Sequence, residues 1–214
     1  AISVWATINN LKLNVSKSLE IIVRRPRFPS SHPSIPPPLV GLNRVTSLKT
    51  LGMTFSDSLD FSEHFDSMLS KVAKSMYALR ILRAHGLQGK ELWQVCRATT
   101  VSYLTQYCPA WWGYAGEGQR QRMQASLNKL KKFGFLTPDF SSHQQLCEQM
   151  CDDLFKQVLS NKFHVLHQLL PPEKDMPYSP RERTHNRQLP LADKKFKRNF
   201  IINMLYKIKI ISNM

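Results

Sequence analysis

The segment 24–38, RRPRFPSSHPSIPPP, restricts the folds open to this chain more than any other. Proline fixes φ and lacks the backbone N–H donor, so this segment cannot continue a helix or pair along its length in a sheet. We therefore expect a loop, with three arginines at its start, that separates a small N-terminal part of the chain from a longer C-terminal part.

The residues on either side of this loop favour short strands and turns. Residues 1–23 read as a helix end, a break at Asn9–Asn10, a short strand, a polar turn around Lys17 and a second strand. After the loop, VTSLKTLGMTF predicts a strand or hairpin within residues 39–57. Gly52 lies where a β-bulge or a close backbone approach would suit this hairpin.

Residues 60–168 carry apolar residues at helical spacing, which predicts four helices. The first begins at Asp60, a favourable N-cap with Glu63 three residues later, and stops at Gly86. The others span about 90–106, 117–133 and 142–160. The expected inner stripes include Leu79, Thr99, Tyr103, Met123 and Met150, and also Phe65, Met68, Tyr77, Leu104, Leu127, Phe155 and Val158. Strands followed by helices give an α+β fold class.

The charge balance points to a polyanionic partner. The chain has 214 residues with 30 Lys and Arg against 15 Asp and Glu, a formal net charge of +15 and a pI near 9.9. Such a surplus of positive charge favours nucleic acid as the partner, although a basic protein without a nucleic-acid partner would have the same net charge. No apolar run approaches the roughly 18 to 20 residues that would span a bilayer, so we expect no membrane partner. Four cysteines without framework spacing indicate reduced, intracellular thiols.

The third helix is the most basic. Its candidate nucleic-acid contacts are Arg120, Arg122, Lys129, Lys131 and Lys132. They are expected to bind phosphates, and the alternative is a solvated charged face. Trp111, Trp112 and Tyr114 precede this helix and could stack on unpaired bases. Because large aromatic side chains often close a helical core, we favour a core position for at least one of the two tryptophans.

Metal and catalytic signals are weak. His143, Cys147 and Cys151 recur four residues apart on one helix and could ligate zinc, but no C-x-x-C knuckle is present, so core positions are favoured. The pair Asp152–Asp153 lies within a helix, which suits a two-metal site poorly, and we interpret it as surface charge. From its local sequence Lys17 is a solvated loop lysine rather than a catalytic one.

The order of several segments resembles a known family. W-A-x-x-N-N-L-x-L-N-x-x-K-S-x-x-I-I, from Trp5 to Ile22, is similar to the late palm of reverse transcriptases from non-LTR (LINE-type, jockey-like) retrotransposons. SLKTLGMTF and the following helix, up to Leu87, resemble the hairpin and first thumb helix of that family. LWQVCRATTVSYLTQYCPAWWG resembles its second thumb helix, and HVLHQLLPP a segment beyond the thumb.

This resemblance implies an RNA-directed DNA polymerase and assigns roles to residues. Lys17 matches a late-palm lysine implicated in pyrophosphate departure. Leu51, Gly52, Met53 and Thr54 match a primer-grip-like hairpin. The aromatic-x-Asp-Asp motif that holds Mg²⁺ in the intact family enzyme would lie before Ala1, so the chain alone is expected to be inactive and to hold no cofactor or metal. The implied partners are an RNA template, an RNA–DNA or DNA primer duplex, and the remaining palm and fingers.

The resemblance also implies a domain organisation. Residues 1–57 form a palm remnant with the proline-rich loop and the hairpin, 58–136 a helical thumb, 137–172 a post-thumb helical segment, and 173–214 a basic, weakly ordered tail. The apolar stretch from Phe200 to Ile211 is either a docking helix or sequence that does not fold. The family location is the nucleus and cytoplasm. The alternatives are a non-catalytic, basic helical nucleic-acid-binding module and a transposon remnant without function.

Overall fold

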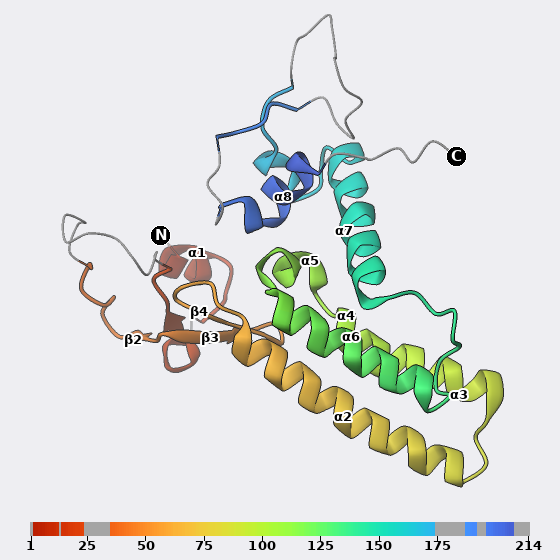
Figure 1. Ribbon diagram of the computed structural model, residues 1–214. Helices are drawn as coiled ribbons and strands as arrows, with labels where there is room; N and C mark the ends of the chain where they lie inside the picture. Colours follow the sequence, from red (N-terminus) through yellow and green to blue (C-terminus); the bar gives the residue numbers. More distant parts are fainter. Residues whose placement is uncertain (1, 13, 24–34, 174–186, 192–195, 208–214) are drawn as a thin grey trace, which may run out of the picture. The chain divides into compact units, whose positions relative to one another are not determined.

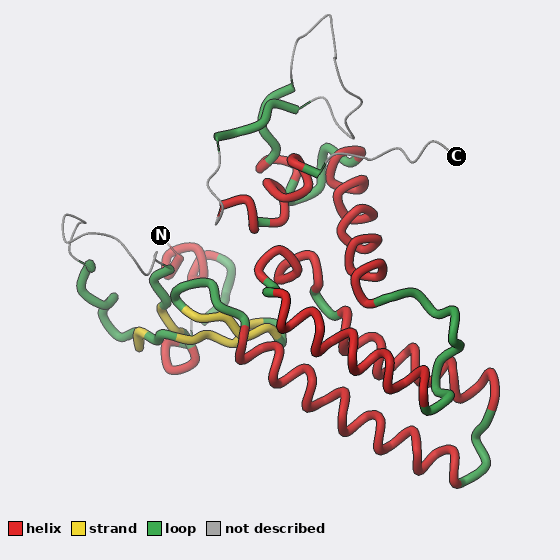
Figure 2. Tube along the Cα trace, viewed as in Figure 1, coloured by secondary structure: helices red, strands yellow, loops and turns green. Residues whose placement is uncertain are grey.

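The structure, a computed structural model, describes residues 2–12, 14–23, 35–173, 187–191 and 196–207. The chain divides into two compact units, residues 1–64 and 65–214, and each is described by itself (Figure 1). Among the described residues, strands occur only in the first unit, and the second is helical (Figure 2). The α+β class expected from the sequence is therefore confirmed in its coarse form. Most of the proline-rich loop, residues 24–34, lies outside the described residues.

The first unit opens with α1 (Ile2–Ile8), which ends at the expected Asn9–Asn10 break. Next come the 3₁₀ turn η1 (Val15–Lys17) and β1 (Leu19–Glu20), which pairs in parallel with β2 (Asn43–Arg44). The strand expected before Lys17 is absent from the described residues, so that prediction is wrong. Asn14 explains why: its side chain accepts from the Lys17 N–H and its carbonyl from the Ser18 hydroxyl, which favours a local turn over a ladder.

The hairpin expected within residues 39–57 is present. Strands β3 (Ser47–Thr50) and β4 (Met53–Ser56) pair antiparallel around the two-residue turn Leu51–Gly52. Both turn residues have positive φ, 49° and 86°, as a type I′ turn requires. Gly52 therefore serves the turn itself, and the expected bulge is not formed.

The start of α2 (Ser62–Ala84) corrects the expected capping box. The Asp60 carboxylate accepts from the Ser62 N–H and hydroxyl, so it does satisfy a free donor at the helix start. The Glu63 carboxylate accepts from the Ser47 hydroxyl instead of returning to the N–H of Asp60. The Asp60 N–H donates to the Ser56 hydroxyl. Glu63 thus contacts the hairpin within the first unit.

The second unit contains a helical bundle at the expected positions. Its elements are α2, α3 (Gly89–Cys96), the π-helical turn η2 (Arg97–Val101), α4 (Ser102–Thr105) and α6 (Glu117–Lys132). Gly86 and Gly134 end α2 and α6 in the left-handed conformation. In both cases the next residue donates back to the helix, Leu87 to Leu82 and Phe135 to Leu130, as in a Schellman motif.

The bundle core is formed by apolar residues from every helix. Its buried members are Phe65, Met68, Val72, Leu79, Leu92, Cys96, Leu104, Met123, Leu127, Leu130 and Phe135. Tyr77 is 66% exposed and Met150 41% exposed, so their expected inward positions are wrong.

The π turn η2 changes the inner face of the second expected helix, which the structure forms from α3, η2 and α4. Leu92 and Cys96 point inward as expected, but the buried residues are then Thr100 and Val101 within η2 and Leu104 and Thr105 in α4. A π turn takes one residue more than an α turn, which rotates everything after it by about 100°. Thr99 and Tyr103, expected inside, are therefore exposed, Tyr103 by 38%.

A second group of helices packs on the bundle. Its elements are α5 (Cys108–Trp111), η3 (Trp112–Tyr114), α7 (His143–Ser160), η4 (His167–Leu169), η5 (Phe196–Arg198) and α8 (Phe200–Tyr206). Helix α7 begins with a complete capping box, Ser142 with Gln145, and contacts α4, α5, α6 and α8. It does so through His143, Cys147, Cys151, Phe155 and Val158, all buried.

Part of the segment expected to be a weakly ordered tail is folded. Helix α8 buries Ile201, Ile202, Met204 and Leu205, so this stretch is a docking helix over residues 200–206. The rest of the apolar stretch, residues 208–211, lies outside the described residues. Across the described ranges, no helix combines the length and apolar character that a membrane span needs.

Candidate nucleic-acid interface

Charge is unevenly distributed among the helices of the second unit. Between residues 62 and 116, which cover α2 to η3, there are three carboxylates, Glu63, Asp66 and Glu91, against six cations: Lys71, Lys74, Arg80, Arg83, Lys90 and Arg97. Helix α6 adds five cations against Glu117 alone. Helix α7 has Glu148, Asp152 and Asp153 against Lys156 alone. A polyanion would therefore be attracted to the bundle and repelled by α7.

Lys129 and Lys132 lie exposed in the last turn of α6. Neither ammonium group has a hydrogen bond or ion pair within the part of the chain that the structure describes. Cations in a last turn also stabilise the negative end of the helix dipole. The two lysines can therefore favour α6 and still contact a phosphate.

Lys131, from the same turn, has a different environment. Its ammonium group donates to the carbonyl oxygens of Pro138 and Phe140, and the side chain is half-buried. Lys131 therefore fixes the loop between α6 and α7, and its ammonium group, unlike those of Lys129 and Lys132, is bonded within the protein.

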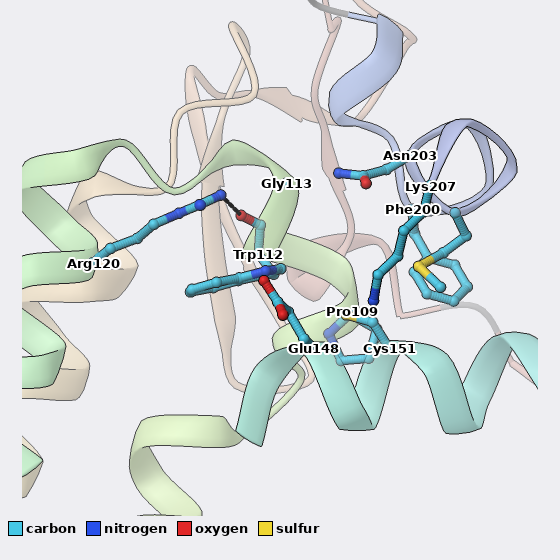
Figure 3. Close-up of a pocket in the computed structure, with 10 residues that line it drawn as sticks. Pro109, Trp112, Gly113, Arg120, Glu148, Cys151, Phe200, Asn203 and Lys207 are labelled. Carbon is cyan, nitrogen blue, oxygen red and sulfur yellow. Dashed lines mark hydrogen bonds between the residues drawn. The ribbon is translucent and has the colours of Figure 1, made fainter. Parts of the chain in front are cut away.

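Arg120 is held by the protein. Its guanidinium lies 4.2 Å from the centroid of the Trp112 ring and donates to the Trp112 carbonyl at 3.2 Å (Figure 3). It also donates to the Ala115 carbonyl at 3.1 Å. A guanidinium that is bonded to carbonyls and stacked on an indole stabilises the fold, and two of its N–H donors are occupied. Arg122, two residues later, is more than half exposed and pairs with Asp66 of α2 at 2.8 Å.

Two further cations of α2 were missed by the sequence reading. Arg80 lies 4.6 Å from the Phe133 ring centroid and Arg83 lies 4.8 Å from that of Phe135. Arg83 also donates to the Phe133 carbonyl at 2.7 Å. The spacing of Arg80 and Arg83, three residues apart on one helix, was the sequence signal that could have identified them. Their aromatic partners lie at the C-terminal end of α6, which the local sequence of α2 does not reveal.

Trp111 and Trp112 belong to the core, as favoured for at least one of them. They are 0% and 8% exposed, and Trp111 stacks on His143 at 6.3 Å with an interplanar angle of 11°. Burial lowers the pKa of His143, partly offset by the contact between its Nε2 and the Leu104 carbonyl at 2.8 Å. Tyr114 is half-buried, and burial raises its pKa. These aromatic side chains are not available to stack on bases.

The cysteines are also core residues. All four are free and buried. Burial raises the pKa of Cys96 to about 11, and a hydrogen-bonding contact with Cys108 raises that of Cys151 far above its usual range. Cys147 Sγ lies 3.6 Å from His143 Nε2, which already contacts a backbone carbonyl. In the described ranges no group of three or more His, Cys, Asp or Glu is placed to hold a metal.

A pocket of about 220 Å³ lies between η3, α7 and α8 (Figure 3). Arg120, Glu148 and Lys207 line it together with the Trp112 indole and the Phe200 ring. Lys207 contacts both oxygens of Asp152 at 2.8 Å, so Asp152 belongs to an ion pair between helices. Asp153 is an exposed partner of Lys156. The charges around this pocket are satisfied within the protein, and its geometry gives no catalytic arrangement.

The remaining sequence candidates lie in the first unit. Lys17 is exposed at the end of η1. In the hairpin, Leu51 is 86% exposed at the tip and Thr54 is buried on β4. The turn therefore presents an apolar side chain to solvent.

Comparison with known proteins gives no relative: no family model, curated protein or solved structure matches this chain.

Proposed function

We propose that this chain is the late-palm and thumb part of an RNA-directed DNA polymerase from a non-LTR retrotransposon. In this proposal it contributes to binding of the template–primer duplex. The sequence contains no aromatic-x-Asp-Asp motif, so the chain by itself does not polymerise nucleotides. Its partners are an RNA template, an RNA–DNA or DNA primer duplex, and the remaining palm and fingers, which would hold Mg²⁺. Its locations are the cytoplasm and the nucleus.

The observation that carries the proposal is the segregation of charge over the helical unit. Helix α6 has five cations against one carboxylate and α2 has four against two, whereas α7 is acidic, and Lys129 and Lys132 present exposed ammonium groups. Phosphate contacts of this kind hold a duplex without reading its sequence. The position of the type I′ turn at Leu51–Gly52, where the resemblance puts a primer-grip-like hairpin, is a supporting detail.

Two other functions are compatible with the same basic bundle. A non-catalytic nucleic-acid-binding module would bind duplex equally well, and the charge distribution favours it as the second candidate. A transposon remnant without function would bind weakly or not at all.

The experiment that separates the first two is the sequence of the transcript upstream of the codon for Ala1. The proposal predicts an open frame that continues into an aromatic-x-Asp-Asp motif and a fingers region. A stop codon or a frame shift close to Ala1 would leave only the binding module or the remnant. A companion assay with added Mg²⁺ and a primed RNA template should show no nucleotide incorporation by the purified chain.

A further inference from the structure

Two tyrosines at the end of the helical segment α3–α4 are partly exposed to solvent, although tyrosine side chains can be buried in a helical core. Tyr103 is 38% exposed and Tyr107, four residues later, is 44% exposed. The sequence periodicity places Tyr103 inward, and the π turn η2 rotates it outward. Because π turns inside helices are frequently found at functional sites, this rotation is a pointer to function.

Tyr107 has a second unusual feature, its backbone. It adopts the left-handed conformation with φ 58° and ψ 23°, between α4 and α5. Glycine or asparagine fits this conformation better than a bulky side chain, which is strained there. Tyr107 therefore combines a strained backbone with an exposed aromatic side chain. Positions that depart from local preferences in this way are concentrated at functional sites.

A cation lies beside the Tyr103 ring. Lys71 Nζ lies 6.0 Å from the Tyr103 ring centroid, and Lys74 follows one turn later on the exposed side of α2. The hydroxyls of Ser75 and Thr100 share a hydrogen bond of 2.6 Å, which fixes α2 against the π turn. The nearest carboxylates in sequence are Asp66, which is paired with Arg122, Glu91 at the other end of α3, and Glu117 in the first turn of α6.

We propose that Tyr103, Tyr107, Lys71 and Lys74 form a binding surface for a single strand of nucleic acid. Exposed aromatic rings stack on unpaired bases of any sequence, and lysines beside them neutralise the adjoining phosphates. A duplex hides its base faces, so the rings would add little to duplex binding. This surface is distinct from the α6 lysines, and its assignment rests on the proposed nucleic-acid function.

The test compares two fluorescent probes, an oligo(U) RNA of about 12 nucleotides and an RNA–DNA hybrid of similar length. The variant Tyr103→Leu/Tyr107→Asn removes both rings but keeps the fold, because leucine retains the half-buried contact and asparagine accepts the left-handed backbone. We expect it to weaken oligo(U) binding by about tenfold or more, and hybrid binding by less than about twofold. Far-UV circular dichroism and the melting temperature check that it folds.

The matched control is Tyr103→Phe/Tyr107→Phe, which keeps both rings and should bind oligo(U) within about twofold of the unaltered chain. Lys71→Gln/Lys74→Gln should lower the salt slope for oligo(U) by about 1.4, since each phosphate contact on a single strand contributes roughly 0.7.

Unchanged oligo(U) binding by Tyr103→Leu/Tyr107→Asn would overturn the proposal, and so would an equal loss on both probes or an equal loss in the Phe control. If the unaltered chain binds the hybrid but replacing the tyrosines leaves oligo(U) binding unchanged, only the proposed single-strand surface is refuted. If it binds neither probe at about 50 mM salt, the proposed function falls with it.

Discussion

Replacing Gly113 with alanine tests how the C-terminal helix is held against the core. A Cβ at this position would lie 2.1 Å from the Arg198 carbonyl oxygen and 3.2 Å from the Asn203 amide nitrogen. The nearest obstacle is backbone, so either η3 or the segment before α8 must shift by about 1 Å to restore van der Waals contact. Overpacking of this kind costs about 1 to 3 kcal/mol.

Comparing the strain energy with the cost of releasing α8 predicts whether the helix stays docked. Full release of α8 would expose Ile201, Ile202, Met204 and Leu205. At about 1.5 to 3 kcal/mol for each side chain, this exposure would cost at most roughly 6 to 12 kcal/mol. Because the strain is smaller than this, we expect α8 to stay docked in a strained position. The free energy of unfolding should fall by about 1 to 3 kcal/mol, and α8 amides should exchange faster without losing all protection.

The assay is urea unfolding followed by tryptophan fluorescence, with hydrogen exchange over residues 199–207. The matched control is Gly118→Ala in the first turn of α6, where a Cβ meets nothing within 4 Å. It should raise stability by up to about 1 kcal/mol, because alanine favours a helix over glycine. The reasoning is refuted if Gly113→Ala is as stable as the unaltered chain, or if Gly118→Ala is destabilised equally.

Three further predictions concern other parts of the chain. Leu51→Asn should stabilise the first unit by about 0.5 to 1 kcal/mol, because asparagine suits the positive φ of the type I′ turn; a lower midpoint in urea would contradict this. Arg120→Met should lower the free energy of unfolding by about 2 to 4 kcal/mol, because it removes the stacking on Trp112 and the bonds to backbone carbonyls. Arg122→Met removes only an exposed ion pair and should lower it by less than about 1 kcal/mol. Equal losses of stability in the two variants would contradict this distinction. Because burial lowers the pKa of His143 in the folded state, the unfolded state binds more protons, and stability should fall as pH drops below about 6.5. His143→Gln should flatten this dependence, and an unchanged pH profile in that variant would show that another group is responsible.

Features that depend on nearby residues were predictable from the sequence. The four helix spans agree with the structure to within about two residues, because Gly86 and the Ser142–Gln145 pair mark helix ends locally. The hairpin could be placed for the same reason. The capping box at Asp60 failed because Glu63 has a better partner in Ser47, sixteen residues away in sequence.

Features that depend on distant contacts could not be predicted. The π turn is tied to Ser75 of another helix, so periodicity alone placed Tyr103 on the wrong face. Arg120 and Lys131 look like free cations in the sequence, and their carbonyl partners, although only five to nine residues away, lie in connecting segments outside α6 whose path periodicity does not predict. The docking of α8 at Gly113 is likewise a contact between residues far apart in the chain.

The central claim, that the basic helices hold a nucleic-acid duplex through its phosphates, is tested most directly by a salt titration. Binding of the purified chain to an RNA–DNA hybrid is measured between about 50 and 200 mM salt. We predict a loss of affinity of orders of magnitude over this range, and a slope about 1.8 smaller for Lys129→Gln/Lys132→Gln, since each duplex phosphate contact contributes roughly 0.9. Binding that ignores salt, or no binding at the lowest salt, would contradict the account.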